Sequence, residues 1–288
     1  MILVLVVVAR NIKSVVENNM ELKILGKIPL ENLERKERKK RPEFFAEEIN
    51  LKMKEVVKGV NEKYGEIVDL DGRIKVDNSD DLRYIEIKES AWAQEKDQSL
   101  KEYREKQENS DSSLAEKAIT LSLAKVLGSR FISLRSSSYD DYENGIDNVL
   151  LDTETGSLVC GFDEVVAGYG QDGSSKKEDK IMKKFAKGGS YAKYGLEINP
   201  DTKEVKVTKK KNIPNFYISV AKSELSELLE NVSKPDLSEI EKKVLSDVVF
   251  SLQYQIEKMK SYQDQVNENL VNNLKKTESF VNLLSEKL

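Results

Sequence analysis

The sequence predicts an α+β protein in which a mixed β-sheet is flanked by helices and followed by long C-terminal helices. Two observations predict the sheet and its helices: segments with helical apolar spacing occur beside short apolar runs, and turn residues bound those runs. A third predicts the C-terminal helices, since neither Pro nor Gly occurs after Pro235. We divide the 288 residues into an N-terminal helix-rich extension with a small hairpin (1–109), an α/β core (110–232) and a C-terminal helical segment (233–288).

The composition excludes several kinds of active site. The chain has no histidine, which excludes Ser-His-Asp and Cys-His catalysis and histidine-ligated zinc. It also lacks the Gly-Lys-Ser/Thr sequence of a phosphate-binding P-loop. Carboxylates, lysines, tyrosines and a metal ion remain as the groups available for chemistry. The single cysteine, Cys160, excludes an internal disulfide and favours a reducing compartment, so we expect a cytoplasmic protein.

The N-terminal extension begins with an apolar run. Residues 1–9 are too few to span a bilayer, which needs about 20 residues, so we expect a buried strand and no membrane partner. A true start at Met20 stays open as an alternative. Residues 30–63 have a charged helical pattern, and the basic run 35–41 within it is typical of a solvated helix face.

Two short strands are expected next, at 67–76 and 83–88, around a loop of turn-forming residues. The second carries Glu86-Ile-Lys88, an acid and a lysine two positions apart. With Glu47 or Glu48 and Asp77, this pair is an alternative candidate site. A polar helix over 91–109 would then lead through a linker, 108–113, into the core.

The core begins with a helix and a hairpin that carry acidic residues. Helical apolar spacing over 114–127 places Glu116 near the start of a helix that Gly128 ends. The apolar runs 146–151 and 158–166 flank the turn sequence Asp-Thr-Glu-Thr-Gly and predict a hairpin.

The pairing of this hairpin decides where its acidic residues lie. If Leu151 pairs with Leu158, Asp147 lies opposite Phe162, and a bulge at Gly156 would bring Asp147 opposite Asp163. Two adjacent carboxylates are costly unless a cation holds them.

This succession of acidic residues resembles the PD-(D/E)XK nuclease superfamily, whose fold is that of restriction endonucleases. The residues that carry the resemblance are Glu116 in LAEKA, Asp147 in NGIDNVLLD and Asp163 in CGFDEVV. The strand expected at 213–220 and the helix after it are similar to the next elements of that family. The resemblance covers about residues 110–232 and implies a restriction-endonuclease-like core.

The resemblance also implies a function: metal-dependent phosphodiester hydrolysis on nucleic acid. Asp147 and Asp163 would bind Mg²⁺ or Mn²⁺, and Glu116 would hold a water or a second ion. One position departs from the family, because Val165 stands where its motif has a lysine. Lys176, Lys177 or Lys180 would have to supply that amine. The alternative is a catalytically inactive nuclease-like fold that acts as a binding or assembly module.

A glycine-rich sequence follows the hairpin. Residues 168–173 have the GxGxxG spacing of a dinucleotide fingerprint, but the next helix is polar where such a fingerprint needs an apolar face. A loop beside the site is therefore the favoured interpretation. Residues 174–222 contain 13 lysines and 5 acidic residues, so this segment carries +8 and is suited to a nucleic-acid backbone. It includes a second predicted hairpin, 191–198 and 204–208.

An apolar stripe runs through 237–288. Its 14 steps cover 51 residues, about 3.64 residues each, which exceeds the 3.5 of a left-handed coiled coil. One or two straight helices are therefore expected, packed on the body of the protein or on a partner in a helix-mediated oligomer.

Overall fold

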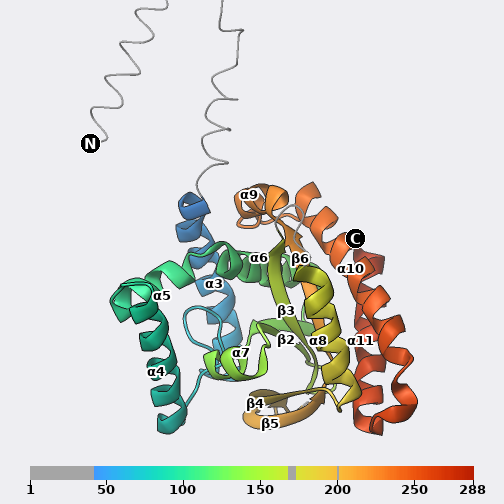
Figure 1. Cartoon of the computed structure of the whole chain (residues 1–288). Helices are drawn as coiled ribbons and strands as arrows, with labels where there is room; N and C mark the ends of the chain where they lie inside the picture. Colours follow the sequence, from blue (N-terminus) through green and yellow to red (C-terminus); the bar gives the residue numbers. More distant parts are fainter. Residues whose placement is uncertain (1–41, 168–172, 200) are drawn as a thin grey trace, which may run out of the picture. The chain divides into compact units, whose positions relative to one another are not determined.

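A computed structural model describes residues 42–167, 173–199 and 201–288, and it has an α+β architecture (Figure 1). These residues contain a mostly antiparallel six-stranded open sheet with helices around it. The predicted opening strand, the basic run 35–41 and all of the glycine-rich sequence except Gly173 lie outside the described residues. Within them, no helix combines the length and apolar character that a membrane crossing requires.

Helix α3 (Pro42–Tyr64) overlaps the charged helix predicted over 30–63, of which residues 30–41 lie outside the described residues. Its buried side chains include Ile49 and Met53, which join the core cluster of α6. The strand predicted at 67–76 is wrong in extent, since only isolated bridges form there. One joins Val68 to Ile74, and another joins Arg73 to Arg135.

The strand predicted at 83–88 is wrong, because these residues lie in helix α4 (Ser79–Glu95). The side chain of Asn78 caps this helix by accepting hydrogen bonds from the backbone N–H groups of Asp80 and Asp81. Buried residues then recur at every fourth position, at 81, 85, 89 and 93. The cap and this helical stripe outweigh the short polar–apolar alternation that favoured a strand.

The polar helix predicted over 91–109 is divided in two. Residues 91–95 end α4, and α5 (Leu100–Glu108) begins at a capping box formed by Ser99 and Glu102. Helix α6 (Asp111–Leu127) follows directly, with Ser110 as its N-cap and Gly128 after its last turn. The predicted core helix is confirmed, and the predicted linker 108–113 is reduced to two residues.

The predicted hairpin is confirmed as β2 (Asn148–Asp152) and β3 (Ser157–Ala167). Leu151 pairs with Leu158, as predicted, while Asn148 pairs with Phe162. The register shifts between Leu150 and Leu151, so the bulge lies inside the hairpin and not at Gly156. If this pairing continues by one residue, Asp147 is opposite Asp163.

The remaining strands complete one sheet. Strand β1 (Phe131–Arg135) pairs antiparallel with β2, and β6 (Asn215–Ala221) pairs parallel with β3. The hairpin predicted around 199–201 is confirmed as β4 (Ser190–Ile198) and β5 (Val205–Ile213). Strand order is β1-β2-β3-β4-β5, with β6 beside the second half of β3.

Helices connect these strands and cover the sheet. Helix α7 (Ser138–Asn144) joins β1 to β2, α8 (Gly173–Ala186) follows β3, and α9 (Lys222–Asn231) follows β6. Figure 1 shows α8 beside β6, with the β4–β5 hairpin inserted between them in the chain. The core elements run in the order α6, β1, α7, β2, β3, α8, β4, β5, β6, α9.

The apolar C-terminal stripe forms two helices, α10 (Glu239–Lys260) and α11 (Glu268–Lys287), around a short 3₁₀ turn (Gln263–Gln265). They pack against each other, α10 on β6 and α11 on β3. Their apolar residues, including Leu252 and Phe280, belong to the largest core cluster. Packing on the body is thus confirmed, and a helix-mediated oligomer stays a prediction.

The turn of the β2–β3 hairpin contacts the end of β4, and a substitution at Gly156 tests this contact. Gly156 has φ +68°, and a Cβ at this position would lie 1.7 Å from the carbonyl oxygen of Ile198. Gly156→Ala should lower the free energy of unfolding by about 3 kcal/mol or more, since both backbone strain and a backbone clash arise. Urea unfolding measures the change. Gly59→Ala is the control, because Gly59 has open space around it in α3 and should be neutral or stabilising; equal stability of the two variants would contradict this hairpin geometry.

Candidate functional site

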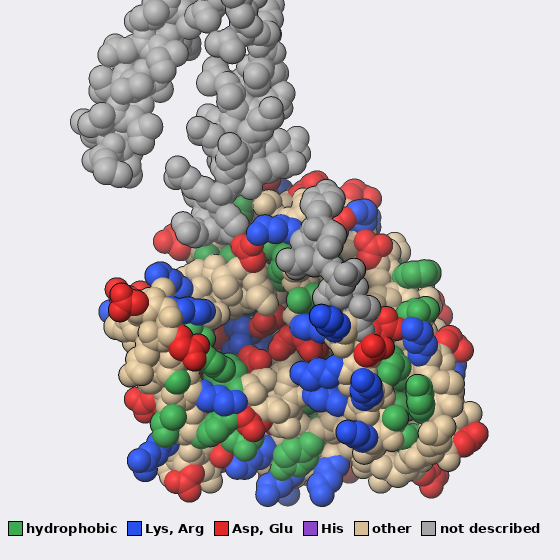
Figure 2. Space-filling model, in the orientation of Figure 1, with side chains coloured by type: hydrophobic (Ala, Val, Ile, Leu, Met, Phe, Trp, Pro, Cys, Tyr) green, Lys and Arg blue, Asp and Glu red, His purple; other side chains and the backbone are tan. Residues whose placement is uncertain are grey.

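A cleft of about 600 Å³ brings all three predicted site residues, Glu116, Asp147 and Asp163, to one place. Its walls come from the segment 69–73 after α3, from helices α4 to α7, from the end of β1, from the residue before β2, and from β3 and the start of α8. Figure 2 shows it as a hollow in which acidic and basic side chains meet. The chain's single tryptophan, Trp92, forms part of the wall, in edge contact with the Tyr142 ring at 5.0 Å.

Glu116 projects from α6 and is held by arginines. Its Oε2 accepts a hydrogen bond from Nη2 of Arg135 at 2.6 Å, and Nη2 of Arg73 lies 3.7 Å away. The Arg135 side chain is only 2% exposed. Two guanidinium groups therefore neutralise this buried carboxylate.

Asp147 immediately precedes β2, where its carboxylate faces β3. Its Oδ2 accepts a hydrogen bond from the backbone N–H of Glu164 at 2.7 Å. Burial, together with the nearby charges of Glu164, Asp141 and Glu116, raises the pKa of Asp147 well above its ordinary value. This carboxylate is therefore costly to ionise unless a cation is beside it.

Glu164 is the residue that the sequence analysis missed. It follows Asp163 on β3, is 3% exposed, and lines the same cleft. Its Oε1 accepts a hydrogen bond from Nδ2 of Asn148 at 2.7 Å, while its Oε2 is buried with no hydrogen-bond partner in the described structure. Burial, followed by the charge of Glu116, raises the pKa of Glu164 to about 8.

Strand alternation is the signal that could have identified Glu164. Side chains two apart in a strand share a face, so Glu164 shares one with Cys160 and Phe162. Both of these are fully buried in the cluster that includes α6, the helix that carries Glu116. Glu164 therefore lies on the face of β3 that packs against α6, the helix of Glu116.

Asp163 lines the cleft but already has a cation. Its Oδ1 accepts a hydrogen bond from Nζ of Lys177 at 2.6 Å. Lys177 is one of the three lysines expected to reach the site from the helix after β3. The other two, Lys176 and Lys180, line a separate groove on α8.

A second group of cations lies behind Glu116. Nη1 of Arg73 is 3.1 Å from Oδ2 of Asp141, and the charges of Asp141 and Glu116 raise the pKa of Arg73 although its burial acts to lower it. Lys117 is fully buried, and its Nζ donates to Oδ1 of Asn50 at 2.7 Å. Burial, and then the charge of Arg135, lower the pKa of Lys117.

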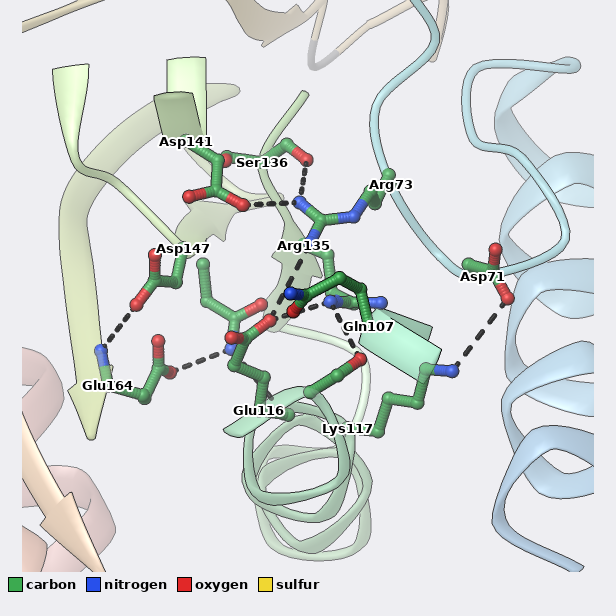
Figure 3. A network of polar contacts seen from close by, with 12 residues as sticks. Asp71, Arg73, Gln107, Glu116, Lys117, Arg135, Ser136, Asp141, Asp147 and Glu164 are labelled. Carbon is green, nitrogen blue, oxygen red and sulfur yellow. Dashed lines mark hydrogen bonds and ion pairs between the residues drawn. The ribbon is translucent and has the colours of Figure 1, made fainter. Parts of the chain in front are cut away.

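The charges at the centre of the cleft do not balance. Nine acidic and four basic residues line the cleft, and five of the acids, at 116, 141, 147, 163 and 164, come from α6, α7, the residue before β2, and β3. Neither Asp147 nor Glu164 makes an ion pair with a described residue, whereas the other three carboxylates do. If every group is ionised, the lining carries an excess of five negative charges, which a bound cation would reduce. Figure 3 shows Asp147 beside Glu164, and the arginines beside Glu116. The amide of Asn148 lies between the two groups, since its Nδ2 donates to Oε1 of Glu164 and to the carbonyl oxygen of Glu116.

The cleft offers carboxylate oxygens of the kind that a hard cation prefers, but fewer of them than a complete protein-only metal site requires. The unpartnered Oε2 of Glu164 and the carboxylate of Asp147 are oxygen ligands of the kind that Mg²⁺ and Mn²⁺ prefer. No group of three or more acidic or cysteine side chains stands ready to hold a metal ion among the described residues. Mg²⁺ is commonly held by only one or two carboxylates, together with waters and substrate phosphates. The pair Asp147 and Glu164 is suited to that kind of site.

Comparison of the chain with models of protein families, with curated proteins and with solved structures found no match. The case for any activity therefore depends on the geometry of the cleft.

The alternative site at Glu86 and Lys88 is not formed. Both residues lie on α4, where positions two apart point in different directions. Glu86 is exposed, and Nζ of Lys88 is 2.6 Å from Oε1 of Glu143 in a partly exposed ion pair. This interpretation was wrong because it depended on a strand that the chain does not form.

Proposed function

We propose that the protein hydrolyses phosphodiester bonds of nucleic acid with the help of Mg²⁺ or Mn²⁺. The observation that carries this proposal is the joint placement of Glu116 on α6, Asp147 before β2 and Glu164 on β3, all around one cleft. The element order from α6 to α9, with β6 parallel to β3, supports the restriction-endonuclease-like core that the sequence resemblance predicts.

Asp147 and Glu164 are proposed as the groups that hold the cation. When bound, such an ion lowers the pKa of a water molecule and neutralises charge on the phosphate that is attacked. The N–H of Glu164 fixes the orientation of the Asp147 carboxylate, and Asn148 fixes that of Glu164. Because these supports come from the backbone and from a buried amide, the two carboxylates are held in place before any ion binds.

Glu116, Arg135 and Arg73 form the opposite side of the proposed site. The guanidinium of Arg73, whose side chain is 17% exposed, is the group available to a phosphate, to which arginine binds well because its N–H donors form a planar fork, while the buried Arg135 holds Glu116. Glu116 keeps these two cations in the cleft in the absence of substrate.

Lys177 is proposed to replace the lysine that the family motif places on the strand. Two positions after Asp163 stands Val165, and two after Glu164 stands Val166, so neither choice of acid supplies an amine. Nζ of Lys177, at 2.6 Å from Asp163, is a cation at the rim of the cleft. The lysine-rich segment 174–222 is proposed to contact nucleic acid, and the lone Cys160 favours the cytoplasm as the location.

A catalytically inactive binding or assembly module is the second candidate. The pairing of Glu116 with Arg135 and of Asp163 with Lys177 favours it, because protein cations already neutralise these two acids. Phe250 and Tyr254 on α10 are 74% and 50% exposed, which would suit contact with another chain.

Incubation with labelled DNA and RNA tests the proposal. We expect cleavage that requires Mn²⁺ or Mg²⁺, that stops with EDTA, and that Asp147→Ala abolishes. The same metals should raise the melting temperature of the wild-type protein by mass action and leave that of Asp147→Ala unchanged. Absence of cleavage together with a metal-induced rise in melting temperature would favour the binding module, and absence of both would remove the metal site as well.

A further inference from the structure

A row of lysines leads away from the cleft along α8. A groove of about 460 Å³ follows this helix, and its lining residues are Lys176, Asp179, Lys180, Lys183, Lys184 and Lys187. At about 1.5 Å per residue, the row extends roughly 15 Å from Lys177 in the cleft to Lys187. Figure 2 shows blue side chains next to the hollow, on the side where Figure 1 places α8.

A second basic groove lies between β5 and α11. It has a volume of about 720 Å³ and is lined by Lys209, Lys211, Asn212, Asn269, Asn272, Asn273, Lys275 and Lys276. No acidic residue is among these lining residues. None of the four lysines makes an ion pair with a residue that the structure describes, although the chain as a whole carries a charge of −4. Strand alternation brings Lys209 and Lys211 to one face of β5, and Asn269, Asn272 and Asn273 share one face of α11.

Hydrogen bonds connect the two grooves. Asn212 donates from Nδ2 to the carbonyl oxygen of Gly188 at 2.9 Å, directly after the lysine row ends. Asn273 donates from Nδ2 to the carbonyl oxygen of Asn212 at 3.1 Å. The end of α8, strand β5 and helix α11 are thus fixed to one another, and the β5–α11 groove begins where the α8 row stops.

The four lysines of the β5–α11 groove, which have no acidic partner among the described residues, favour an anion there. Like charges held together repel one another, and surface lysines are usually interspersed with acids. A single small anion would occupy one end of this path, whereas a chain of regularly spaced phosphates would occupy all of it. Asparagine amides donate to phosphate oxygens as lysines do, without adding further charge.

We propose that the β5–α11 groove is a second backbone-binding site, and that the substrate is a nucleic-acid polymer that continues from the cleft along α8 to this groove. This proposal rests on the proposed function in one respect: the cleft is taken as the place where the bound strand is cleaved, and the β5–α11 groove as the place where the rest of the strand is held. It assigns to α11 a binding role in addition to its packing role in the core.

Binding measured without turnover tests the groove by itself. Fluorescence anisotropy in EDTA compares the wild-type protein with a variant in which Lys209, Lys211, Lys275 and Lys276 are all changed to Gln. The probes are a labelled single strand of about 24 nucleotides and one of about 5 nucleotides that fits the cleft alone. The charge-matched control changes Lys54, Lys63, Lys234 and Lys287 to Gln, four exposed lysines outside both grooves.

We expect the groove variant to bind the long strand at least about tenfold more weakly and to reduce the salt slope by about three, because each phosphate contact on a single strand contributes about 0.7 to it. The short strand should bind both variants and the wild type alike. Three results would overturn the proposed binding role of the groove. They are an unchanged affinity of the groove variant for the long strand, an equal loss of affinity in the control variant, and tighter binding of polyglutamate than of the long strand. Cleavage in Mn²⁺ is measured separately. If the protein cleaves nucleic acid but the groove variant binds the long strand as tightly as the wild type, the groove proposal fails and the nuclease proposal stands. If the groove variant binds more weakly but no cleavage occurs, the nuclease proposal fails and the groove proposal stands.

Discussion

Glu164→Gln should abolish metal-dependent cleavage, while Asp163→Asn should leave most of it. Glu164 is buried with one carboxylate oxygen unpartnered, and Asp163 is bound to Lys177. Metal-ion catalysis supplies several kcal/mol of transition-state stabilisation, so loss of the ligand should reduce the rate by a factor on the order of a thousand. Loss of a partly exposed ion pair at Asp163 should cost less than about fivefold.

The comparison uses two adjacent acids and two isosteric amides, so each variant is the matched control of the other. Cleavage rates of a labelled strand at saturating Mn²⁺ give the first measurement, and the Mn²⁺-induced change in melting temperature gives the second. Both should be lost in Glu164→Gln and kept in Asp163→Asn. The opposite result would return the metal-ligand role to Asp163, as the sequence analysis predicts.

In EDTA the wild-type protein should lose stability as the pH rises from about 5 to about 8. The pKa of Glu164 is about 8 in the folded state, against an ordinary value of 4.5. Between these values the folded protein keeps a proton that the unfolded chain releases. Stability is therefore fully present below pH 4.5 and is lost as the pH rises through 8. At about 1.4 kcal/mol per unit of pKa, this raised pKa changes the free energy of unfolding by several kcal/mol, on the order of the stability of a small domain.

Asp147 acts in the same direction, since its pKa is also raised by burial and by neighbouring acids. Urea unfolding at several pH values measures the effect. Glu164→Gln should flatten the curve and be more stable than the wild type at pH 8, because a neutral amide replaces the carboxylate. Added Mn²⁺ should restore wild-type stability most strongly at high pH, where fewer protons must leave as the ion binds. If the free energy of unfolding of the wild-type protein did not change with pH, neither Glu164 nor Asp147 would be protonated in the folded state.

The sequence contains enough local information to predict most of the core. Apolar spacing and Gly128 predict α6, and the turn residues before Leu158 predict the hairpin. The elements that position Glu116 and Asp147 could therefore be predicted from the sequence. The pairing of Leu151 with Leu158 was predicted as well. These features depend on neighbours in the chain, which is why pattern and turn chemistry suffice to find them.

The features that the sequence analysis predicted wrongly or did not identify depend on contacts between distant residues. Residues 83–88 alternate like a strand, but the Asn78 cap and the packing of Ile85 and Glu89 make them helical. The choice between Asp163 and Glu164 depends on the position of the hairpin bulge and on which face α6 covers. Arg73 and Arg135 reach Glu116 from separate segments, so no spacing in the sequence could have predicted their pairing.

The position of Trp92 has a practical consequence. Because it is the only indole in the chain and forms part of the cleft wall beside Tyr142, the tryptophan emission of the folded protein, excited selectively over that of the 11 tyrosines, comes from one known place. Quenching or a spectral shift on addition of an ion or an oligonucleotide would report events at the cleft, and the distant β5–α11 groove would be silent in the same experiment. The unlabelled protein thus carries an optical probe that separates its two proposed binding regions.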